Sequence, residues 1–354
     1  MKIGIITQPL EDNYGGILQN WALQQYIFSL GHNPITIDYG LKYGWPRYFL
    51  SCCKTIVCRL KGNKRIFPHR PRYGRYCSKY TSDFIHNNIV KTHPVRDLSY
   101  IILKKYNIDT IVVGSDQIWR PKYSSHVEDG FLEFANDFKG KRIAYAVSFG
   151  VDNWEYSSEQ TEKCKSLVKK FDAISVREES GIKLCKTHLN IENVATVLDP
   201  TLLLSVDNYI NLCKNIDISN NRFIAVYCID ITEERQIIIN NVSKKLGIPF
   251  RIFSANRNIK LTIEEWLAMF RDAEFVITDS FHGTVFSIIF QKPFYTMVNA
   301  ERGRSRFESL LSKLGLTDRM SQNCIDSTIN WKQVNDCLCL LNNNSVKFLS
   351  ENLK

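Results

Sequence analysis

The sequence predicts an α/β protein with two lobes, each built around a parallel β-sheet. The chain has 354 residues, which is long for one domain and sufficient for two separate cores. Short runs rich in β-branched and aromatic residues alternate with longer segments of helical period, as βαβ units require. A polar stretch from Asn215 to Asn221 interrupts this rhythm, which starts again at Phe223.

The predicted strands are short apolar runs bounded by turn-forming residues. In the first lobe they span Ile3 to Thr7, Thr110 to Val113, Ile143 to Val147, Ala173 to Val176, and Ala195 to Leu198. In the second lobe they span Phe223 to Cys228, Phe250 to Phe253, Phe275 to Thr278, and Phe294 to Val298. Helices with one apolar face are predicted at Ile17 to Leu30, Glu233 to Leu246, and Ile263 to Arg271.

These elements assign residues 1–215 to the first lobe, 222–320 to the second, and 321–354 to a helical tail that packs back on a lobe. The first lobe is expected to carry a basic insertion at residues 39–82. Between Tyr39 and Ser82 there are eleven Lys or Arg residues and no Asp or Glu, against a net charge of +10 for the whole chain. Such a segment is expected to bind either an anionic membrane surface or an acceptor that carries linked phosphates. An insertion that meets only solvent is the alternative, and no nucleic-acid partner is expected because no binding motif accompanies the charge.

Composition bears on location and on metals. No run reaches the roughly 18 apolar residues of a membrane span, and the start turns polar too early for a signal peptide. We therefore expect a cytoplasmic protein, with peripheral contact to the inner face of the membrane.

The eleven cysteines are scattered and odd in number, which favours reduced thiols. They also lack the paired spacing of a zinc site, so no structural metal is expected.

Ligands of open parallel sheets bind beyond the carboxyl ends of the strands, which directs attention to the loops that follow them. The loop after the first predicted strand contains Asn13, Tyr14, Gly15 and Gly16 and opens directly into a helix. Its glycines allow close backbone approach, and the free amides of the first helical turn favour an anion. An ordinary strand-to-helix turn is the alternative interpretation.

A second loop, after Val113, contains Ser115, Asp116, Gln117 and Trp119. Asp116 suits a general acid or base, or a partner for sugar hydroxyls, and Trp119 offers an apolar ring face. The structural alternative is an aspartate that caps the next helix.

Two further loops carry basic side chains. Arg177, after Val176, has the planar guanidinium that grips a carboxylate or a phosphate, but neighbouring glutamates also allow an ordinary surface pair. After Thr278, a segment with Ser280, His282 and Gly283 leads into an apolar helix, so a histidine and free amides meet at one helix N-terminus. We expect a catalytic role for His282, with a structural histidine as the alternative.

Five motifs, taken in order, resemble the polysaccharide pyruvyl transferase family. They are NYGGILQNWAL, VVGSDQIW, SVREESG, VLDPTLLL and ITDSFHGTVFSIIFQKPF, and the resemblance runs from about Lys2 to about Arg319. It implies two Rossmann-like lobes, similar to the GT-B architecture, with the active site between them. It also implies transfer of pyruvate from phosphoenolpyruvate onto two hydroxyls of a glycan sugar, as a ketal, with release of phosphate. Phosphoenolpyruvate is then the donor substrate, and no cofactor is implied.

The resemblance also implies roles for single residues. By motif position, His282 matches a proposed catalytic histidine, Arg177 an arginine proposed to bind the donor, and Asp116 an acidic position facing the cleft. We expect His282 to transfer the proton and Asp116 to orient the acceptor or share the transfer. The other residues expected to bind substrate are Asn13, Tyr14, Gly15, Gly16, Ser115, Gln117, Trp119, Ser280 and Gly283. Some family members have an arginine where this chain has Ser280, and Arg302, Arg304 and Arg306 are the expected substitutes.

Two other functions fit the same features. A GT-B-like glycosyltransferase that uses a nucleotide sugar is the nearest, because one fold hosts both reactions. No Asp-x-Asp motif is present, which argues against its metal-assisted form and predicts a metal-independent enzyme. The second alternative is a glycan-binding protein that keeps the cleft without catalysis. The acceptor is expected to be a glycan, with lipid linkage suggested by the basic segment.

Overall fold

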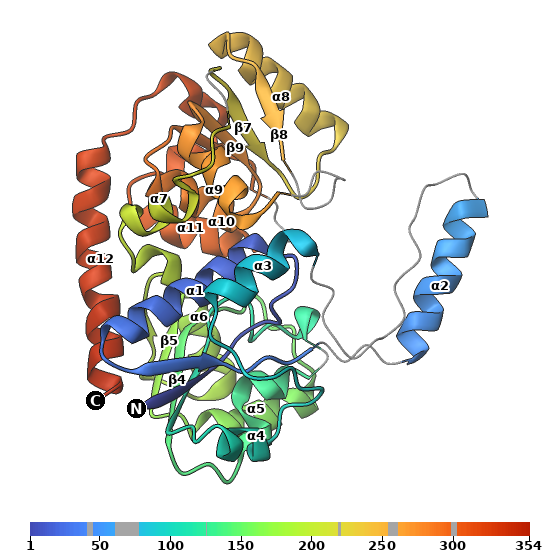
Figure 1. The fold of residues 1–354 in the computed structure, drawn as a ribbon, viewed down its shortest axis with the longest axis vertical. Coiled ribbons are helices and arrows are strands. Elements are labelled where there is room, and N and C mark those ends of the chain that lie inside the picture. The colour runs from blue at the N-terminus through green and yellow to red at the C-terminus, as the bar shows by residue number, and fades with distance from the viewer. Residues whose placement is uncertain (41–44, 61–77, 125, 219–220, 254–260, 299–302) are drawn as a thin grey trace.

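The structure, a computed structural model, describes residues 1–40, 45–60, 78–124, 126–218, 221–253, 261–298 and 303–354. Two parallel β-sheets lie in two lobes with helices packed around them (Figure 1). The strand order is β2-β1-β3-β4-β5-β6 in the first sheet and β10-β9-β7-β8 in the second. The predicted class, α/β with two Rossmann-like lobes and parallel sheets, is confirmed.

Each predicted strand is present, with small shifts at its ends. The first sheet contains β1 (Lys2–Ile6), β2 (Asn33–Thr36), β3 (Thr110–Val113), β4 (Lys141–Val147), β5 (Ala173–Val176) and β6 (Ala195–Thr196). The second contains β7 (Ile224–Tyr227), β8 (Phe250–Ile252), β9 (Phe275–Thr278) and β10 (Phe294–Thr296). Only β2 was not predicted. It contains Pro34, which argues against a strand in sequence, but β2 lies at the edge of the sheet, where proline is tolerated.

The helices fill the connections between strands. They are α1 (Tyr14–Ser29), α2 (Trp45–Leu60), α3 (Lys79–Asn88), α4 (Tyr100–Lys105), α5 (Ser158–Val168), α6 (Glu179–Leu184), α7 (Val206–Cys213), α8 (Glu233–Leu246), α9 (Ile263–Asp272), α10 (Phe281–Ile289), α11 (Arg304–Lys313) and α12 (Trp331–Asn352). The start of α1 lies before the predicted Ile17, because the Asn13 side chain caps the helix by accepting a hydrogen bond from Gly16 N at 3.1 Å.

The C-terminal helix α12 returns to the first lobe (Figure 1). Leu349 and Leu353 are buried in one apolar cluster with Ile3 and Ile5 of β1. Farther up the helix, Ser345 Oγ accepts a hydrogen bond from Leu198 N at 2.9 Å. The end of α12 is therefore part of the first lobe's core, whereas Cys324 and Val334, earlier in the tail, are buried with side chains of the second lobe.

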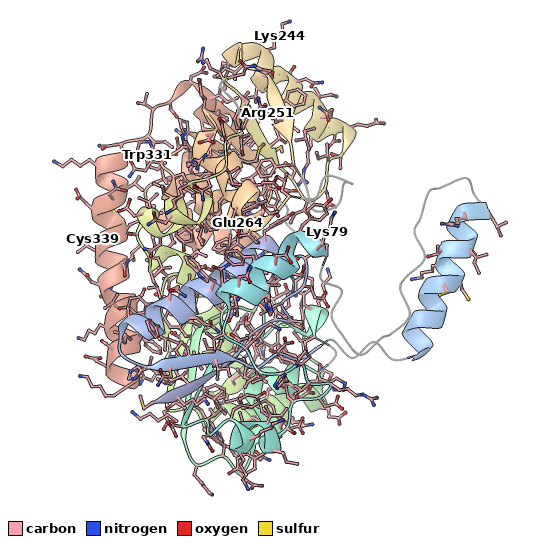
Figure 2. All side chains as sticks on the ribbon, viewed as in Figure 1. Lys79, Lys244, Arg251, Glu264, Trp331 and Cys339 are labelled. Carbon is pink, nitrogen blue, oxygen red and sulfur yellow. The ribbon has the colours of Figure 1, made fainter. Side chains whose placement is uncertain are left out.

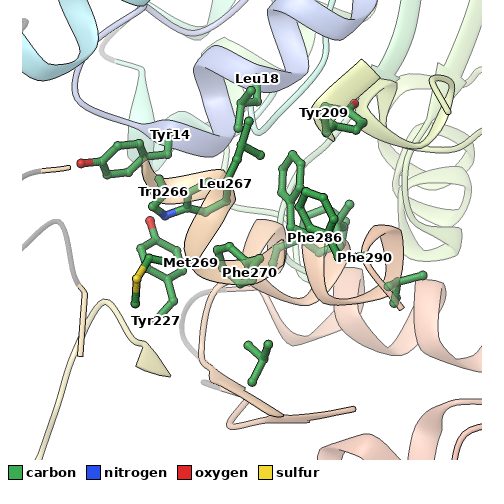
Figure 3. Close-up of a cluster of buried hydrophobic side chains, with 14 of the residues drawn as sticks. Tyr14, Leu18, Tyr209, Tyr227, Trp266, Leu267, Met269, Phe270, Phe286 and Phe290 are labelled. Carbon is green, nitrogen blue, oxygen red and sulfur yellow. The ribbon is translucent and has the colours of Figure 1, made fainter. Parts of the chain in front are cut away.

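The start of α1 is packed into the second lobe (Figure 3). The Tyr14 ring stacks on Trp266 of α9, with ring centroids 5.5 Å apart. Its hydroxyl donates to Leu261 O at 2.7 Å and accepts from Leu261 N at 3.1 Å. Leu18 joins the same cluster. The loop before α1 is thereby held in a fixed position relative to the second lobe.

Helix α2 lies apart from both lobes in Figure 1. It belongs to the predicted basic insertion, of which residues 41–44 and 61–77 lie outside the described residues. None of the helices in the described parts of the chain has the length and apolar content needed to cross a membrane.

Candidate active site

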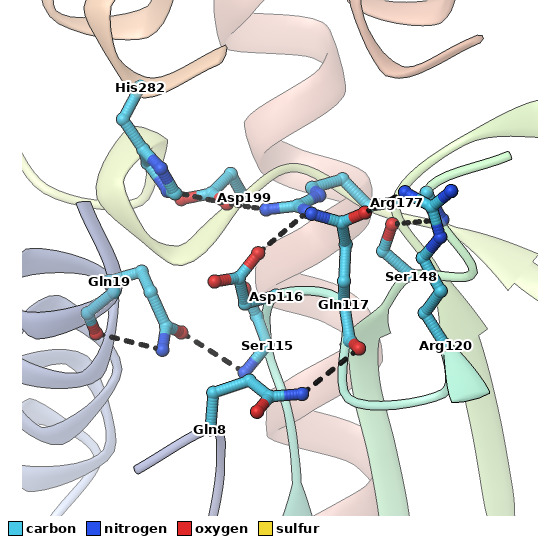
Figure 4. A network of polar contacts seen from close by, with 12 residues as sticks. Gln8, Gln19, Ser115, Asp116, Gln117, Arg120, Ser148, Arg177, Asp199 and His282 are labelled. Carbon is cyan, nitrogen blue, oxygen red and sulfur yellow. Dashed lines mark hydrogen bonds and ion pairs between the residues drawn. The ribbon is translucent and has the colours of Figure 1, made fainter. Parts of the chain in front are cut away.

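Charged side chains from both lobes meet beyond the carboxyl ends of the two sheets (Figure 4). Arg177, directly after β5, donates from Nη1 to Asp199 Oδ2 at 2.6 Å, and its Nη2 lies 3.4 Å from Asp116 Oδ1. His282, in the first turn of α10, places Nε2 3.6 Å from the same Asp199 oxygen. All four side chains are buried. The structure thus brings together the three residues that the sequence analysis placed at the centre of the site.

Asp199 is the member of this group that the sequence analysis did not single out. It follows β6 and caps a short 3₁₀ turn at Pro200–Leu202, where Oδ1 accepts from Thr201 N at 3.1 Å and from Thr201 Oγ1 at 2.7 Å. Its other oxygen is left for Arg177 and His282. Asp199 could have been found from its position just beyond a strand, because the rule that selected the other loops applies to this one as well.

Both aspartates are ionised at neutral pH. Burial by itself would raise the pKa of Asp199, but the adjacent imidazole and the Arg177 guanidinium outweigh it and hold the pKa well below its usual value. Burial also opposes ionisation of Asp116, yet Arg177 and then His282 lower its pKa below the usual value. Asp116 therefore accepts hydrogen bonds or protons and is not a proton donor.

Arg177 does not form the surface pair with neighbouring glutamates that the sequence left open. Glu178 instead accepts hydrogen bonds from Ser148 Oγ at 2.8 Å and from Phe149 N at 3.0 Å. Burial tends to lower the pKa of Arg177, but Asp199 and Asp116 more than compensate and raise it above its usual value. Arg177 is a buried, permanently charged group.

A second guanidinium, Arg306 of α11, lies at the same place. The Phe281 ring has the Arg177 guanidinium carbon 4.6 Å from its centroid and that of Arg306 5.3 Å from it. Burial, followed by the charge of Arg177, lowers the pKa of Arg306 to about 10, so it remains protonated at neutral pH. Two cations from opposite lobes thus face one ring, an arrangement that favours binding of an anion.

Of the other arginines expected near the donor, Arg304 lies elsewhere. Its side chain is 60 % exposed and pairs with Glu308 at 2.6 Å. It lines a separate cavity of about 610 Å³ together with Arg235 and Tyr295. The expectation that Arg304 joins the donor site is therefore corrected, and Arg302 lies outside the described residues.

The loop before α1 shapes the site around the histidine. A Cβ atom added to Gly15 would overlap Nδ1 and Cγ of the His282 imidazole. Gly15 therefore allows the start of α1 to approach the ring, while Gly16 donates to the cap Asn13. Both hydrogen-bonding functions of the Tyr14 hydroxyl are used by Leu261, which corrects the expectation that this group binds substrate.

In the loop after β3, Asp116 has an uncommon backbone conformation. Its φ of 66° lies in the left-handed region, where aspartate is better tolerated than most non-glycine residues. Gln117 instead supports the loop, since its Oε1 accepts from Arg120 Nη1 at 3.0 Å.

Two neighbours of Asp116 belong to the core. Trp119 is fully buried, stacks on Phe131 at 4.4 Å and donates from Nε1 to Gly130 O at 2.8 Å. Ser115 is also fully buried, and its N donates to Gln19 Oε1 at 3.0 Å. The predicted contacts of Ser115 and Trp119 with substrate are corrected, because neither side chain has exposed surface.

The segment before α10 is fixed from behind. Ser280 caps α10 by accepting from Gly283 N at 3.4 Å. A Cβ atom on Gly283 would overlap Thr278 Oγ1 of β9, so this glycine allows the helix to pack on its sheet. The expectation that Gly283 contacts the substrate is therefore corrected. Asp279 accepts from Ile229 N at 2.7 Å and from Arg235 Nη1 at 2.6 Å. These contacts fix the position of the start of α10, which carries His282 in its first turn.

The chain matches the sequence model of one family, described as polysaccharide pyruvyl transferase, over residues 13–301. It belongs to the polysaccharide pyruvyl transferase family. No curated protein matches it. In the described parts of the chain, no three His, Cys, Asp or Glu side chains are grouped as a metal site.

Several solved structures are similar over nearly their whole length. One is a UDP-GlcNAc 2-epimerase from Neisseria meningitidis bound to UDP-GlcNAc, at 10% identity and a TM-score of 0.47, covering 98% of this chain and 100% of that one. Another is the UDP-GlcNAc 2-epimerase of Methanocaldococcus jannaschii, at 14% identity and a TM-score of 0.44, covering 96% and 99%. A third is the spinosyn rhamnosyltransferase SpnG, at 9% identity and a TM-score of 0.42, covering 99% and 95%. Similarity this distant does not bear on the activity of the chain.

Proposed function

We propose that the chain transfers pyruvate from phosphoenolpyruvate onto two hydroxyls of a glycan sugar, forming a ketal and releasing phosphate. Membership of the family supports this reaction. The single observation that carries it is the meeting of His282 with Arg177 and Asp199 across the two lobes. A histidine proposed to carry the proton, a cation proposed to bind the anionic donor and a carboxylate in contact with both lie within one group.

The donor is an anion with a carboxylate and a phosphate. Arg177 and Arg306 place positive charge next to the Phe281 ring. Guanidinium groups bind carboxylate and phosphate through paired, charge-assisted hydrogen bonds. These two arginines are the groups we assign to the donor, and the departing phosphate benefits from the same charge.

In the proposed reaction, the imidazole of His282 gives a proton to the terminal carbon of the enol, converting it to a methyl group. The first sugar hydroxyl attacks the neighbouring carbon, and Asp116, which is ionised, receives or orients its proton. The second hydroxyl then attacks the same carbon as the bond to phosphate breaks. One hydroxyl proton replaces the proton lost from His282 and the other leaves with phosphate, so atoms and charges balance.

Asp199 has a supporting role in this scheme. It is ionised and lies 3.6 Å from Nε2 of the imidazole, so it orients the ring. It also fixes Arg177 through the shorter contact of 2.6 Å. One carboxylate therefore aligns the proton donor with the cation assigned to the donor substrate.

The test is incubation with phosphoenolpyruvate and a panel of galactosides, mannosides and glucosides, each in soluble and lipid-linked form. We expect equal amounts of released phosphate and of a product heavier by one pyruvyl ketal, measured by mass spectrometry. Nucleotide release from a sugar nucleotide, with phosphoenolpyruvate left intact, would favour the glycosyltransferase alternative. Glycan binding without phosphate release would favour the non-catalytic alternative.

Metal independence is a separate prediction of the same scheme, because the positive charge comes from arginines. Turnover is expected to be unchanged in excess chelator. Loss of turnover that Mg²⁺ or Mn²⁺ restores would contradict it.

A further inference from the structure

Helix α2 presents a stripe of large apolar side chains to solvent. Leu50 is 63 % exposed, Val57 50 % and Leu60 82 %. The helix that carries them lies apart from both lobes (Figure 2). At 3.6 residues per turn these three positions lie on one side of the helix, with Cys53 between them and Ile56 at the edge. A contiguous exposed stripe of this kind marks an interaction surface.

The rest of α2 is basic. Lys54 and Arg59 are exposed and lie off the apolar stripe. No acidic residue occurs in α2 or anywhere between Tyr39 and Ser82. A helix with one apolar side and a polar side that carries only positive charge suits the headgroup region of an anionic bilayer.

Both ends of the segment that contains α2 are attached near the active site. Before α2, the Tyr39 hydroxyl donates to Thr7 O, just beyond β1, at 2.7 Å. After it, the hydroxyls of Ser78 and Thr81 donate to Asp12 Oδ1 at 2.8 Å and 2.6 Å. Thr7 and Asp12 belong to the loop that carries Gly15, the residue in contact with the imidazole. The insertion is therefore tethered at the edge of the site.

The tether before α2 is short. Residues 41–44 are all that separate Gly40 from Trp45. A fully extended chain covers at most about 3.4 Å per residue, so α2 begins within roughly 17 Å of Gly40 in any conformation of the connection. The start of α2 therefore stays near the edge of the first sheet where the site is found.

We propose that α2 binds the surface of an anionic lipid bilayer and holds the mouth of the active site next to it. The charged residues of α2 are all positive and lie beside an apolar stripe, and this combination favours an anionic bilayer over a groove on a protein partner. If the proposed function holds, the glycan acceptor is linked to a lipid in that membrane. Binding to the bilayer itself does not depend on the reaction.

The experiment measures sedimentation of the full chain with vesicles, in the absence of phosphoenolpyruvate and glycan. One set of vesicles contains equal amounts of phosphatidylglycerol and phosphatidylcholine, and the other contains phosphatidylcholine alone. We expect binding to the first set and little to the second. Because a basic residue near an anionic surface contributes about fivefold to binding, Lys54→Glu with Arg59→Glu should weaken it at least about tenfold. Leu50→Ser with Leu60→Ser should weaken it to a similar extent.

Matched controls carry the same changes on the two lobes. Ile101 and Leu340 are 75 % and 67 % exposed, so Ile101→Ser with Leu340→Ser removes comparable apolar groups. Lys183→Glu with Lys332→Glu reverses two exposed charges outside α2. Both control proteins should bind vesicles as the wild type does. Unchanged thermal unfolding and unchanged turnover on a soluble acceptor would show that the α2 variants remain folded.

Three results would overturn the proposal. The first is equal binding to both sets of vesicles, and the second is full binding by the α2 variants. The third is evidence that the apolar stripe joins two copies of the chain instead of binding lipid. In the third case a dimer, measured by light scattering without lipid, would be lost in Leu50→Ser with Leu60→Ser, and the wild type would not bind vesicles. Phosphate release on a soluble acceptor tests the proposed function independently, so failure of one does not conceal failure of the other.

Discussion

The loop after β1 and the loop after β9 look alike in sequence and have different roles. Each places a glycine in the first turn of a helix that follows a strand. Gly15 makes room for the imidazole of His282 in the opposite lobe, whereas Gly283 makes room for Thr278 in its own sheet. The first loop shapes the site and the second carries His282, the proposed proton donor. A glycine at such a position therefore indicates a close contact without indicating whether that contact is catalytic.

Removal of the reactive group should have the largest effect. His282→Ala is expected to lower kcat by about a thousandfold, the contribution typical of a positioned acid or base. The variant is expected to fold, since Asp199 keeps its 2.6 Å contact with Arg177 and its hydrogen bonds with Thr201. Phosphate release measures the rate. His93→Ala, at an exposed position, is the control and should be as active as the wild type.

The carboxylate that joins the two lobes should matter for stability as well. Asp199→Asn breaks a buried ion pair and should cost about 3 kcal/mol in the free energy of unfolding at neutral pH. The folded pKa of Asp199 lies below its unfolded value, so its stabilisation is present above about pH 4 and is lost as the pH falls through the folded pKa. Urea unfolding at pH 7 and pH 3 should show a smaller difference between the variant and wild type at pH 3. An equal difference at both would contradict the assignment.

The two glycines give a matched pair of variants. Gly15→Ala should displace the imidazole and lower kcat at least about tenfold, because the three atoms nearest to the new methyl group all belong to the His282 side chain. Gly283→Ala should instead lower the free energy of unfolding by about 1–3 kcal/mol, because it forces α10 away from β9. Kinetics and urea unfolding of both proteins test the comparison directly. The same balance of effects in both variants would show that the loops do not differ as described.

The support behind the second loop should have the smallest effect. Arg235→Ala removes the 2.6 Å contact with Asp279 and lets the segment before His282 shift. We expect kcat to fall by about threefold to tenfold while KM for phosphoenolpyruvate stays within twofold, since Arg235 is not assigned to the donor. Steady-state kinetics measure both constants. A large rise in KM with normal kcat would place Arg235 in substrate binding instead.

Much of this arrangement could be predicted from the sequence, because strands in parallel sheets are apolar runs and their carboxyl ends carry the ligand loops. That rule found Asp116, Arg177 and His282. It did not select Asp199, whose importance depends on contacts with Arg177, 22 positions earlier, and with His282 in the other lobe. It also assigned Trp119 to the substrate, because position in a loop does not reveal the direction of a side chain. The edge strand β2 was hidden by Pro34.

The return of α12 to the first lobe has a consequence for the growing chain on the ribosome. The strands of the first sheet are complete once Thr196 has been made, yet the face of β1 that carries Ile3 and Ile5 is covered in part by Leu349 and Leu353. The part of that face under α12 remains exposed throughout synthesis of the second lobe. Domains commonly fold in order from the N-terminus, and transiently exposed apolar surface favours aggregation. In this protein the lobe made first is the one finished last.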